Sequence, residues 1–284
     1  MSTTADSGVA ARGAAPGPGL ERVSGTAVSF AVTDTLAITG RNLTILRRSP
    51  QLLVFATIQP IIFVLLFRYV FGGAIHASGY ASYIDYLMPG IFVQTITFGS
   101  LNTGVGLAED LHKGLIERFR SLPMARSAVL GGRTVADLVR NIFVVALMLG
   151  VGYLVGFRMD TTVLKFFAGM AILLLFAFSL SWLFAIIGLT AANAETAQAA
   201  SFPILAVLVF ASSAFVPVST MPSWLQSFAN HQPVSVTVNA VRGLLVGGPA
   251  ADTLGRNVIQ SLAWSAAIIG VCAPVAVRMY RKAD

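Results

Sequence analysis

The sequence predicts an all-α membrane protein built on six transmembrane helices, and two observations lead to this fold class. Of the 284 residues, 56% are hydrophobic and only 11% are charged, whereas soluble domains carry roughly a quarter charged residues. Six apolar runs, each close to the ~20 residues that a bilayer requires, divide most of the chain. The basic residues lie between these runs and near the ends, so the formal charge of +7 indicates membrane topology and not nucleic-acid binding.

The N-terminal region predicts two features before the first span. Residues 1–31 are rich in Ala, Gly, Ser, Thr and Pro and predict a disordered cytoplasmic tail, because they cannot bury enough apolar surface to offset ordering entropy. The transmembrane domain then occupies 32–284. Residues 32–48 mix leucines with arginines and predict an interfacial helix with its arginines at the lipid head groups. A plain cytosolic linker helix is the alternative.

The second and fifth spans carry polar residues that require an explanation. Uncompensated polar groups are costly in hydrocarbon, so these side chains either line a substrate pathway or hydrogen-bond inside the bundle. The candidate pathway residues are Gln94, Thr97, Asn102, Ser212, Ser213 and Phe215. The six spans are predicted near 51–71, 87–108, 134–157, 165–189, 199–218 and 257–277.

The distribution of basic residues predicts the orientation of the chain in the plasma membrane. Most of the 19 lysines and arginines lie in the N-terminal tail, in the loop after the second span and at the C-terminus. Basic loops stay on the cytoplasmic side, so both termini are expected to be cytoplasmic. An even number of spans agrees with this orientation.

The stretch EDLHKGLIERFRSLPMAR, at 109–126, is the densest charged segment. Its apolar residues recur at helical spacing, and a proline then ends the helix because it lacks an amide hydrogen. We interpret 109–122 as a cytoplasmic coupling helix through which a soluble partner moves the membrane domain. A helix that only rests on the lipid surface is the alternative. The candidate coupling residues are Glu109, Asp110, Lys113, Leu115, Ile116, Glu117, Arg118, Phe119, Arg120 and Pro123.

The segment 219–256, between the fifth and sixth spans, contains two short apolar stretches that cannot cross a membrane alone. Two extracellular half-helices that dip into the outer leaflet fit this pattern, provided that their backbone ends are buried in protein. A surface loop with an aromatic anchor at the interface is the alternative.

The sequence lacks the groups that most membrane enzymes and ion-coupled carriers need. No Asp or Glu falls at the centre of a predicted span, where a proton- or sodium-coupled carrier usually has one. No G-x-x-x-x-G-K-[ST] motif is present, so no ATPase site is expected. The three histidines are scattered and the one cysteine lies in an apolar run, so neither a metal site nor a disulfide is expected. Asp137 is expected to pair with Arg133 and Arg140, as a structural feature.

Several segments resemble one family. DLHKGLIERFRSLPMARSAVLGGR, at 110–133, closely resembles the cytoplasmic loop of ABC-2 type permeases, with the daunorubicin-resistance type of drug-efflux permease in actinobacteria as the nearest branch. MPSWLQSFANHQPVSVTVNAVRGLLVGG, at 221–248, resembles the extracellular half-helix region of that family. LMPGIFVQ at 87–94 and RMYRK at 278–282 match as well. The resemblance runs from about Thr33 to Lys282, with one departure at Gln232-Pro233, where Asn-Pro is the commoner pair.

The resemblance implies the permease subunit of an ATP-binding cassette exporter for an amphipathic drug or lipid. Two permease chains, identical or paralogous, would pair with two ATPase subunits that use ATP and magnesium, so this chain by itself would not be an enzyme. The helices at 32–48 and 109–122 would be the connecting and coupling helices. Without the resemblance, an ATP-independent channel or lipid scramblase remains an alternative, and a membrane-embedded enzyme is disfavoured because no His, Asp or Glu cluster lies within a span.

Overall fold

The computed structural model describes residues 40, 50–75, 77–113 and 126–282, and every regular element in this part of the chain is helical. The predicted tail and, apart from Gly40, the predicted interfacial helix lie outside the described residues. The elements in chain order are α2 (Pro50–Leu65), the π-helical η1 (Leu66–Phe71), α3 (Tyr83–His112), α5 (Arg126–Leu154), α6 (Val163–Thr190), α7 (Ala194–Phe210), the 3-10 turn η2 (Val218–Thr220), α8 (Ser223–His231), α9 (Pro233–Leu245), α10 (Pro249–Asp252) and α11 (Leu254–Lys282).

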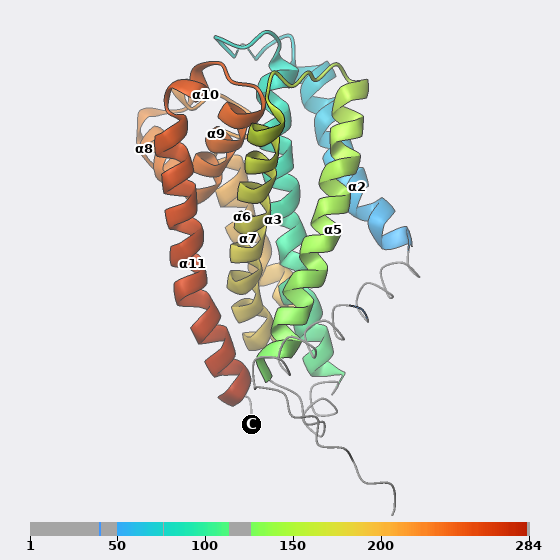
Figure 1. Ribbon diagram of the computed structural model, residues 1–284. Coiled ribbons are helices and arrows are strands. Elements are labelled where there is room, and N and C mark those ends of the chain that lie inside the picture. Colours follow the sequence, from blue (N-terminus) through green and yellow to red (C-terminus); the bar gives the residue numbers. More distant parts are fainter. Residues whose placement is uncertain (1–39, 41–49, 76, 114–125, 283–284) are drawn as a thin grey trace, which may run out of the picture.

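Helices stand at all six predicted spans, and they pack into one bundle (Figure 1). By length and composition, three stretches are able to cross a bilayer, namely Gly132–Leu154, Val163–Thr190 and Leu254–Tyr280. Two shorter apolar helices, Thr57–Phe71 and Ala194–Phe210, accompany them. The model therefore confirms a helical protein with helices of membrane length, whereas a crossing by all six helices stays a prediction.

The second predicted span is polar because it forms the centre of the bundle. The corresponding helix, α3, packs against α2, α5, α6, α7 and α9, and most of its length is buried. Its hydroxyl groups find partners without water. Thr97 Oγ1 donates to the Val93 carbonyl at 2.6 Å. Ser100 Oγ lies 2.8 Å from the Ile96 carbonyl and 3.1 Å from the Ala177 carbonyl of α6. A buried polar helix is stable when its side chains are satisfied in this way.

α3 and α6 touch through their backbones at one level. A Cβ atom added at Gly104 would collide with the carbonyl of Phe184, and one added at Gly188 would collide with the carbonyl of Gly104. Small residues permit such close packing of helices. Because both positions are glycine, no side chain separates the two helices at this crossing.

The fifth predicted span is wrong at its C-terminal end, because α7 stops at Phe210 and not near residue 218. The last carbonyl groups of a helix need donors from outside it. Here they come from a distant side chain, since Gln232 Nε2 lies 2.8 Å from the Leu208 carbonyl and 3.1 Å from the Ala211 carbonyl. Gln232 also precedes Pro233, the first residue of α9. The family departure at Gln232 therefore falls on the residue that closes α7.

The two ends of the bundle contain different elements (Figure 1). The end of α3, the beginning of α5 and the C-terminal end of α11 lie together, and α8, α9 and α10 lie at the opposite end. This grouping is the one that the predicted topology requires, and the two predicted short helices are present as α8 and α9. Which end faces the cytoplasm, and whether α8 and α9 enter a leaflet, stay predictions.

Candidate functional site

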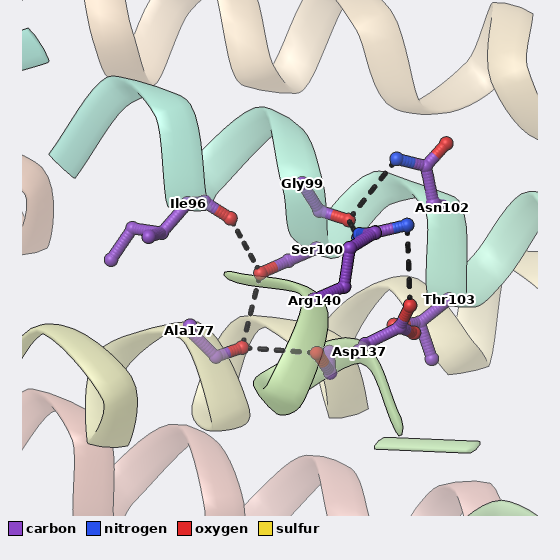
Figure 2. Close-up of polar contacts among 9 residues, drawn as sticks. Ile96, Gly99, Ser100, Asn102, Thr103, Asp137, Arg140 and Ala177 are labelled. Carbon is purple, nitrogen blue, oxygen red and sulfur yellow. Dashed lines mark hydrogen bonds and ion pairs between the residues drawn. The ribbon is translucent and has the colours of Figure 1, made fainter. Parts of the chain in front are cut away.

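Polar contacts join α3 to α5 at the end of the bundle where residues 114–125 connect the two helices. The helices run antiparallel, so residues with higher numbers on α3 contact residues with lower numbers on α5. Figure 2 shows Arg140 beside the Gly99 carbonyl, and Asp137 beside Thr103. The contacts, which we call the polar ladder, are Arg140 Nη2 to the Gly99 carbonyl at 2.6 Å, the Thr103 hydroxyl to the Asp137 carboxylate, and the Arg133 guanidinium to the Asp110 carboxylate.

The charges of the polar ladder are largely removed from water and paired with one another. Asp137 forms an ion pair with Arg140 at 3.3 Å, and each side chain is 13% exposed. The side chains of Arg133 and Asp110 are 23% and 22% exposed. The expected pair of Asp137 with Arg140 is confirmed, whereas Arg133 pairs with Asp110 of α3. Low exposure strengthens such pairs and raises the cost of breaking them.

Two glycines of α3 make room for side chains of α5. A Cβ atom at Gly106 would overlap the Arg133 guanidinium. A Cβ atom at Gly99 would lie 2.5 Å from Asn141 Oδ1 and 3.6 Å from Arg140 Nη2. Gly106 therefore leaves space beside the α3 backbone for Arg133 of the polar ladder, and Gly99 leaves space for Asn141.

Three of the predicted coupling residues fall within the described chain. Glu109 and Asp110 form the last turn of α3 and do not begin a separate helix, while Lys113 is the residue that caps it. The Lys113 ammonium lies 2.5 Å from Glu109 Oε1, and both side chains are more than half exposed. The hydrogen bond to Glu109 raises the pKa of Lys113. The other predicted coupling residues, which lie outside the described residues, are Leu115, Ile116, Glu117, Arg118, Phe119, Arg120 and Pro123.

The predicted pathway residues occupy three separate places. Gln94 and Thr97 are buried in the middle of α3, and Gln94 Oε1 has no hydrogen-bond partner among the described residues. Asn102 lies on an exposed part of α3. The remaining three follow α7 and are buried. Their contacts are Ser212 Oγ to the Val209 carbonyl, Ser213 Oγ to Asn239 Oδ1, and the Phe215 ring on that of Phe67 with 4.6 Å between centroids.

Arg242 of α9 is a buried residue that the sequence analysis missed. It is 2% exposed. Its Nε donates to the Tyr86 carbonyl at 3.0 Å, Nη1 to Asn239 Oδ1 at 2.9 Å, and Nη2 to the Ser213 carbonyl at 2.8 Å. Its Cζ lies 3.7 Å from the centre of the Tyr86 ring. One sequence signal was available, since Arg242 is the single charged residue in the 13 residues of α9.

Tyr80 stands in the loop before α3, close to Arg242. Burial raises the pKa of the Tyr80 hydroxyl, and the positive charge of Arg242 opposes part of this shift. The net direction is upward, so the phenol stays neutral near pH 7 and supplies a hydrogen-bond donor and no negative charge.

The polar contacts of α3 and α5 connect two helices. Among the described residues, no group of three or more His, Cys, Asp or Glu side chains is placed to hold a metal ion. The polar ladder contains paired charges without an exposed nucleophile or acid. Its geometry suits the transmission of movement between α3 and α5.

Comparison with known proteins identifies the family. The model of the ABC-2 type transporter family matches residues 33–246. The chain is 35% identical over 252 residues to the daunorubicin resistance ABC transporter permease protein DrrB1 of Streptomyces coeruleorubidus, covering 89% of this chain and 87% of that protein. It is 28% identical over 262 residues to the probable doxorubicin resistance ABC transporter permease protein DrrC of Mycobacterium tuberculosis, covering 92% and 93%. The chain therefore belongs to the ABC-2 type transporter family.

Proposed function

We propose that this chain is the permease subunit of an ABC exporter that moves an amphipathic drug or lipid out across the plasma membrane. The names of two relatives that align over most of their length support this class, since both are permeases of daunorubicin or doxorubicin resistance. The sequence has no phosphate-binding loop, so a separate ATPase subunit would use ATP and magnesium. Two permease chains, identical or paralogous, and two ATPase subunits would complete the exporter.

The polar ladder is the observation that carries the proposed mechanism. Residues 114–125 connect α3 to α5 in the sequence, and the ladder ties these two helices together. Movement of the segment by an ATPase would therefore displace α3 and α5 as a pair. Because α3 is the central helix, the displacement would reach α6, α7 and α9.

The coupling proposal is tested by separating ATPase binding from transport. Phe119→Ala removes a predicted apolar anchor, and loss of one such anchor costs ~2 kcal/mol or more of binding. We expect less ATPase in pull-downs and less drug efflux. Asp137→Asn weakens the ladder and leaves the predicted docking residues intact. We expect normal ATPase pull-down and ATP hydrolysis with reduced efflux.

Two controls accompany these variants. Glu117→Ala alters a predicted rim charge, which contributes mainly to encounter rate, and should reduce binding less than Phe119→Ala. Lys113→Ala removes an exposed ion pair and, like Glu117→Ala, should reduce binding and efflux less than Phe119→Ala. Normal pull-down and efflux for both Phe119→Ala and Arg118→Glu would contradict the coupling role. Efflux that persists in cells lacking the ATPase would favour the ATP-independent channel or scramblase.

The proposed topology places α8–α10 outside and the end of α3 inside the cell. Ser227 of α8 and His112 of α3 are both exposed and lie in the elements at opposite ends of the bundle. In a chain without Cys272, a cysteine at Ser227 should react with an impermeant thiol reagent in intact cells. A cysteine at His112 should react only after the membrane is opened. The reverse pattern would overturn the orientation.

The candidate pathway residues differ in exposure, so different effects are expected from replacing them. Asn102 is exposed on α3, so it is the pathway candidate best placed to face a second permease chain or cargo. Phe215 is 3% exposed and lies in an aromatic stack. Asn102→Ala should change drug selectivity at normal expression, and Phe215→Ala should lower expression. An unchanged drug spectrum for Asn102→Ala would remove this residue from the pathway.

A further inference from the structure

The Arg242 guanidinium is buried without a negative partner. Its three hydrogen-bond acceptors are two backbone carbonyls and the Asn239 side-chain oxygen, all of them neutral. The ion pairs of the described residues involve other side chains altogether. A buried charge normally requires a partner of opposite sign, because dipoles compensate only part of the lost hydration. Arg242 therefore retains a positive charge that no described residue neutralises.

Two hydrogen-bond donors of Arg242 are also left over. A guanidinium has five N–H groups. One on each of Nε, Nη1 and Nη2 donates to the protein, which leaves one on Nη1 and one on Nη2. Arg242 lines a cavity of about 310 Å³ between the 77–80 loop, η2, α8, α9 and α10. Because Arg242 is one of the lining residues, we assign the two remaining donors to this cavity.

The walls of the cavity favour an anion. None of the lining residues is acidic, and several supply hydroxyl or amide groups, including Ser78, Tyr80, Ser219 and Asn230. Donors that come from several walls match a tetrahedral group with three or four acceptor oxygens more closely than a planar carboxylate with two. Arginine pairs well with phosphate because its planar donors meet two oxygens at once.

The position of the cavity indicates where such a group would come from. It lies at the end of the bundle that contains α8, α9 and α10. On α8, Trp224 is 75% exposed, and exposed tryptophans are enriched at the head-group level of a membrane. Asn230 of the same helix lines the cavity. A lipid phosphate would lie at this level.

We propose that this cavity binds a phosphate group, with the Arg242 guanidinium as its charge partner and an anionic phospholipid as its source. Binding at this site requires neither the ATPase nor transport, so this proposal and the exporter function are tested separately. Free inorganic phosphate offers the same chemistry, and the experiment below distinguishes the two sources.

The test uses the full-length chain purified in detergent and two added carboxylates of equal charge. Ser219→Asp places a negative group in the cavity wall, and Ser227→Asp places one on the exposed face of α8, outside the cavity. Both add the same charge to the same end of the molecule. The probes are dioleoylphosphatidylglycerol and inorganic phosphate, and each is titrated separately. Native mass spectrometry counts the bound adducts of each probe, and the thermal unfolding midpoint is recorded.

We expect Ser219→Asp to weaken phosphatidylglycerol binding at least tenfold and Ser227→Asp to bind as the wild type does. Arg242→Lys, which keeps the charge and loses the planar fork, should also weaken binding. The same contrast with inorganic phosphate would support the site with free phosphate as a source. The proposal would be overturned if the wild type, Ser219→Asp and Ser227→Asp bound each probe equally well. The absence of binding by the wild type would overturn it as well.

Discussion

The two ends of the bundle accommodate buried positive charge in different ways. At the end where α3 leads to α5, Arg133 and Arg140 each meet a carboxylate. At the opposite end, Arg242 meets two carbonyls, one amide oxygen and an aromatic ring. In the first arrangement each arginine charge is balanced by a carboxylate, and the pairs tie two helices together. The second is well hydrogen-bonded but keeps its net charge, so the balance of charge, and not the number of hydrogen bonds, separates a structural contact from a potential binding site.

The largest expected loss of stability comes from removing the carboxylate of the Asp137–Arg140 ion pair. Asp137→Ala removes the carboxylate that meets both Arg140 and Thr103 and leaves a buried cation uncompensated. Such a change costs about 3–5 kcal/mol, which should appear as a lower unfolding midpoint in detergent. Adding Arg140→Met should recover most of the loss, because the double variant buries no unpaired charge. A double variant no more stable than the single one would show that charge balance is not the cause.

A smaller effect is expected at the opposite end, where the ring of Tyr86 partners Arg242. Tyr86→Phe loses the hydrogen bond from the hydroxyl to the Ser213 carbonyl, 2.9 Å long, at a cost of about 1 kcal/mol. Tyr86→Leu loses the ring as well, and a desolvated cation–π contact contributes ~2 kcal/mol. Denaturation should therefore rank Tyr86→Leu about 2 kcal/mol below Tyr86→Phe. Equal stabilities would mean that the ring does not offset the charge.

Two glycine replacements test how tightly the polar ladder is packed. Gly106→Ala brings a Cβ atom into the Arg133 guanidinium, and overpacking of this kind costs ~1–3 kcal/mol. Gly150→Ala, on α5, meets no atom within 4 Å and should stabilise its helix by up to ~1 kcal/mol. The difference in unfolding midpoint measures the space that Arg133 requires. Two variants with the same midpoint would show that Arg133 can move away freely.

The smallest effect is expected for the exposed pair beside the ladder. Lys113 and Glu109 are in hydrogen-bond contact but largely in water, where ion pairs contribute little and are screened by salt. Lys113→Ala should leave the unfolding midpoint unchanged in low and in high salt. A salt-dependent loss of stability in this variant would show that the pair is more deeply desolvated than its exposure indicates.

The hydrophobic pattern predicted the positions of the helices well. It did not predict which residues of other elements contact them. α6 covers Val163–Thr190 where 165–189 was predicted, because a run of apolar residues is visible locally. The end of α7 was misplaced, because Gln232 closes the helix from more than 20 residues away. Likewise Arg133 was expected to pair with Asp137 on its own helix, and only the tertiary packing of α3 on α5 brings Asp110 nearer.

The site was predicted in part for the same reason. Asp110 was recognised from charge density, and its partner on α5 required a structure. Arg242 was not singled out, because the sequence does not show that its charge is buried. The pathway residue Thr97 bonds to a carbonyl of its own helix, and Ser212 bonds to a carbonyl of α7. Hydrogen bonding inside the bundle is the alternative that the sequence left open for them. Their part in transport, like that of Phe119, stays a prediction.

The backbone contact between Gly104 and Gly188 has a mechanical consequence. With no side chain between them, the two backbones meet directly at this level, and Gly90 of α3 meets the backbone of Ala214 in the same way. Gly104 stands six residues from Asp110, roughly 9 Å at 1.5 Å per residue, and Gly90 stands four residues from Tyr86, roughly 6 Å. A displacement of α3 that begins at Asp110 would therefore be passed to α6, and to the chain after α7, before it reached Arg242.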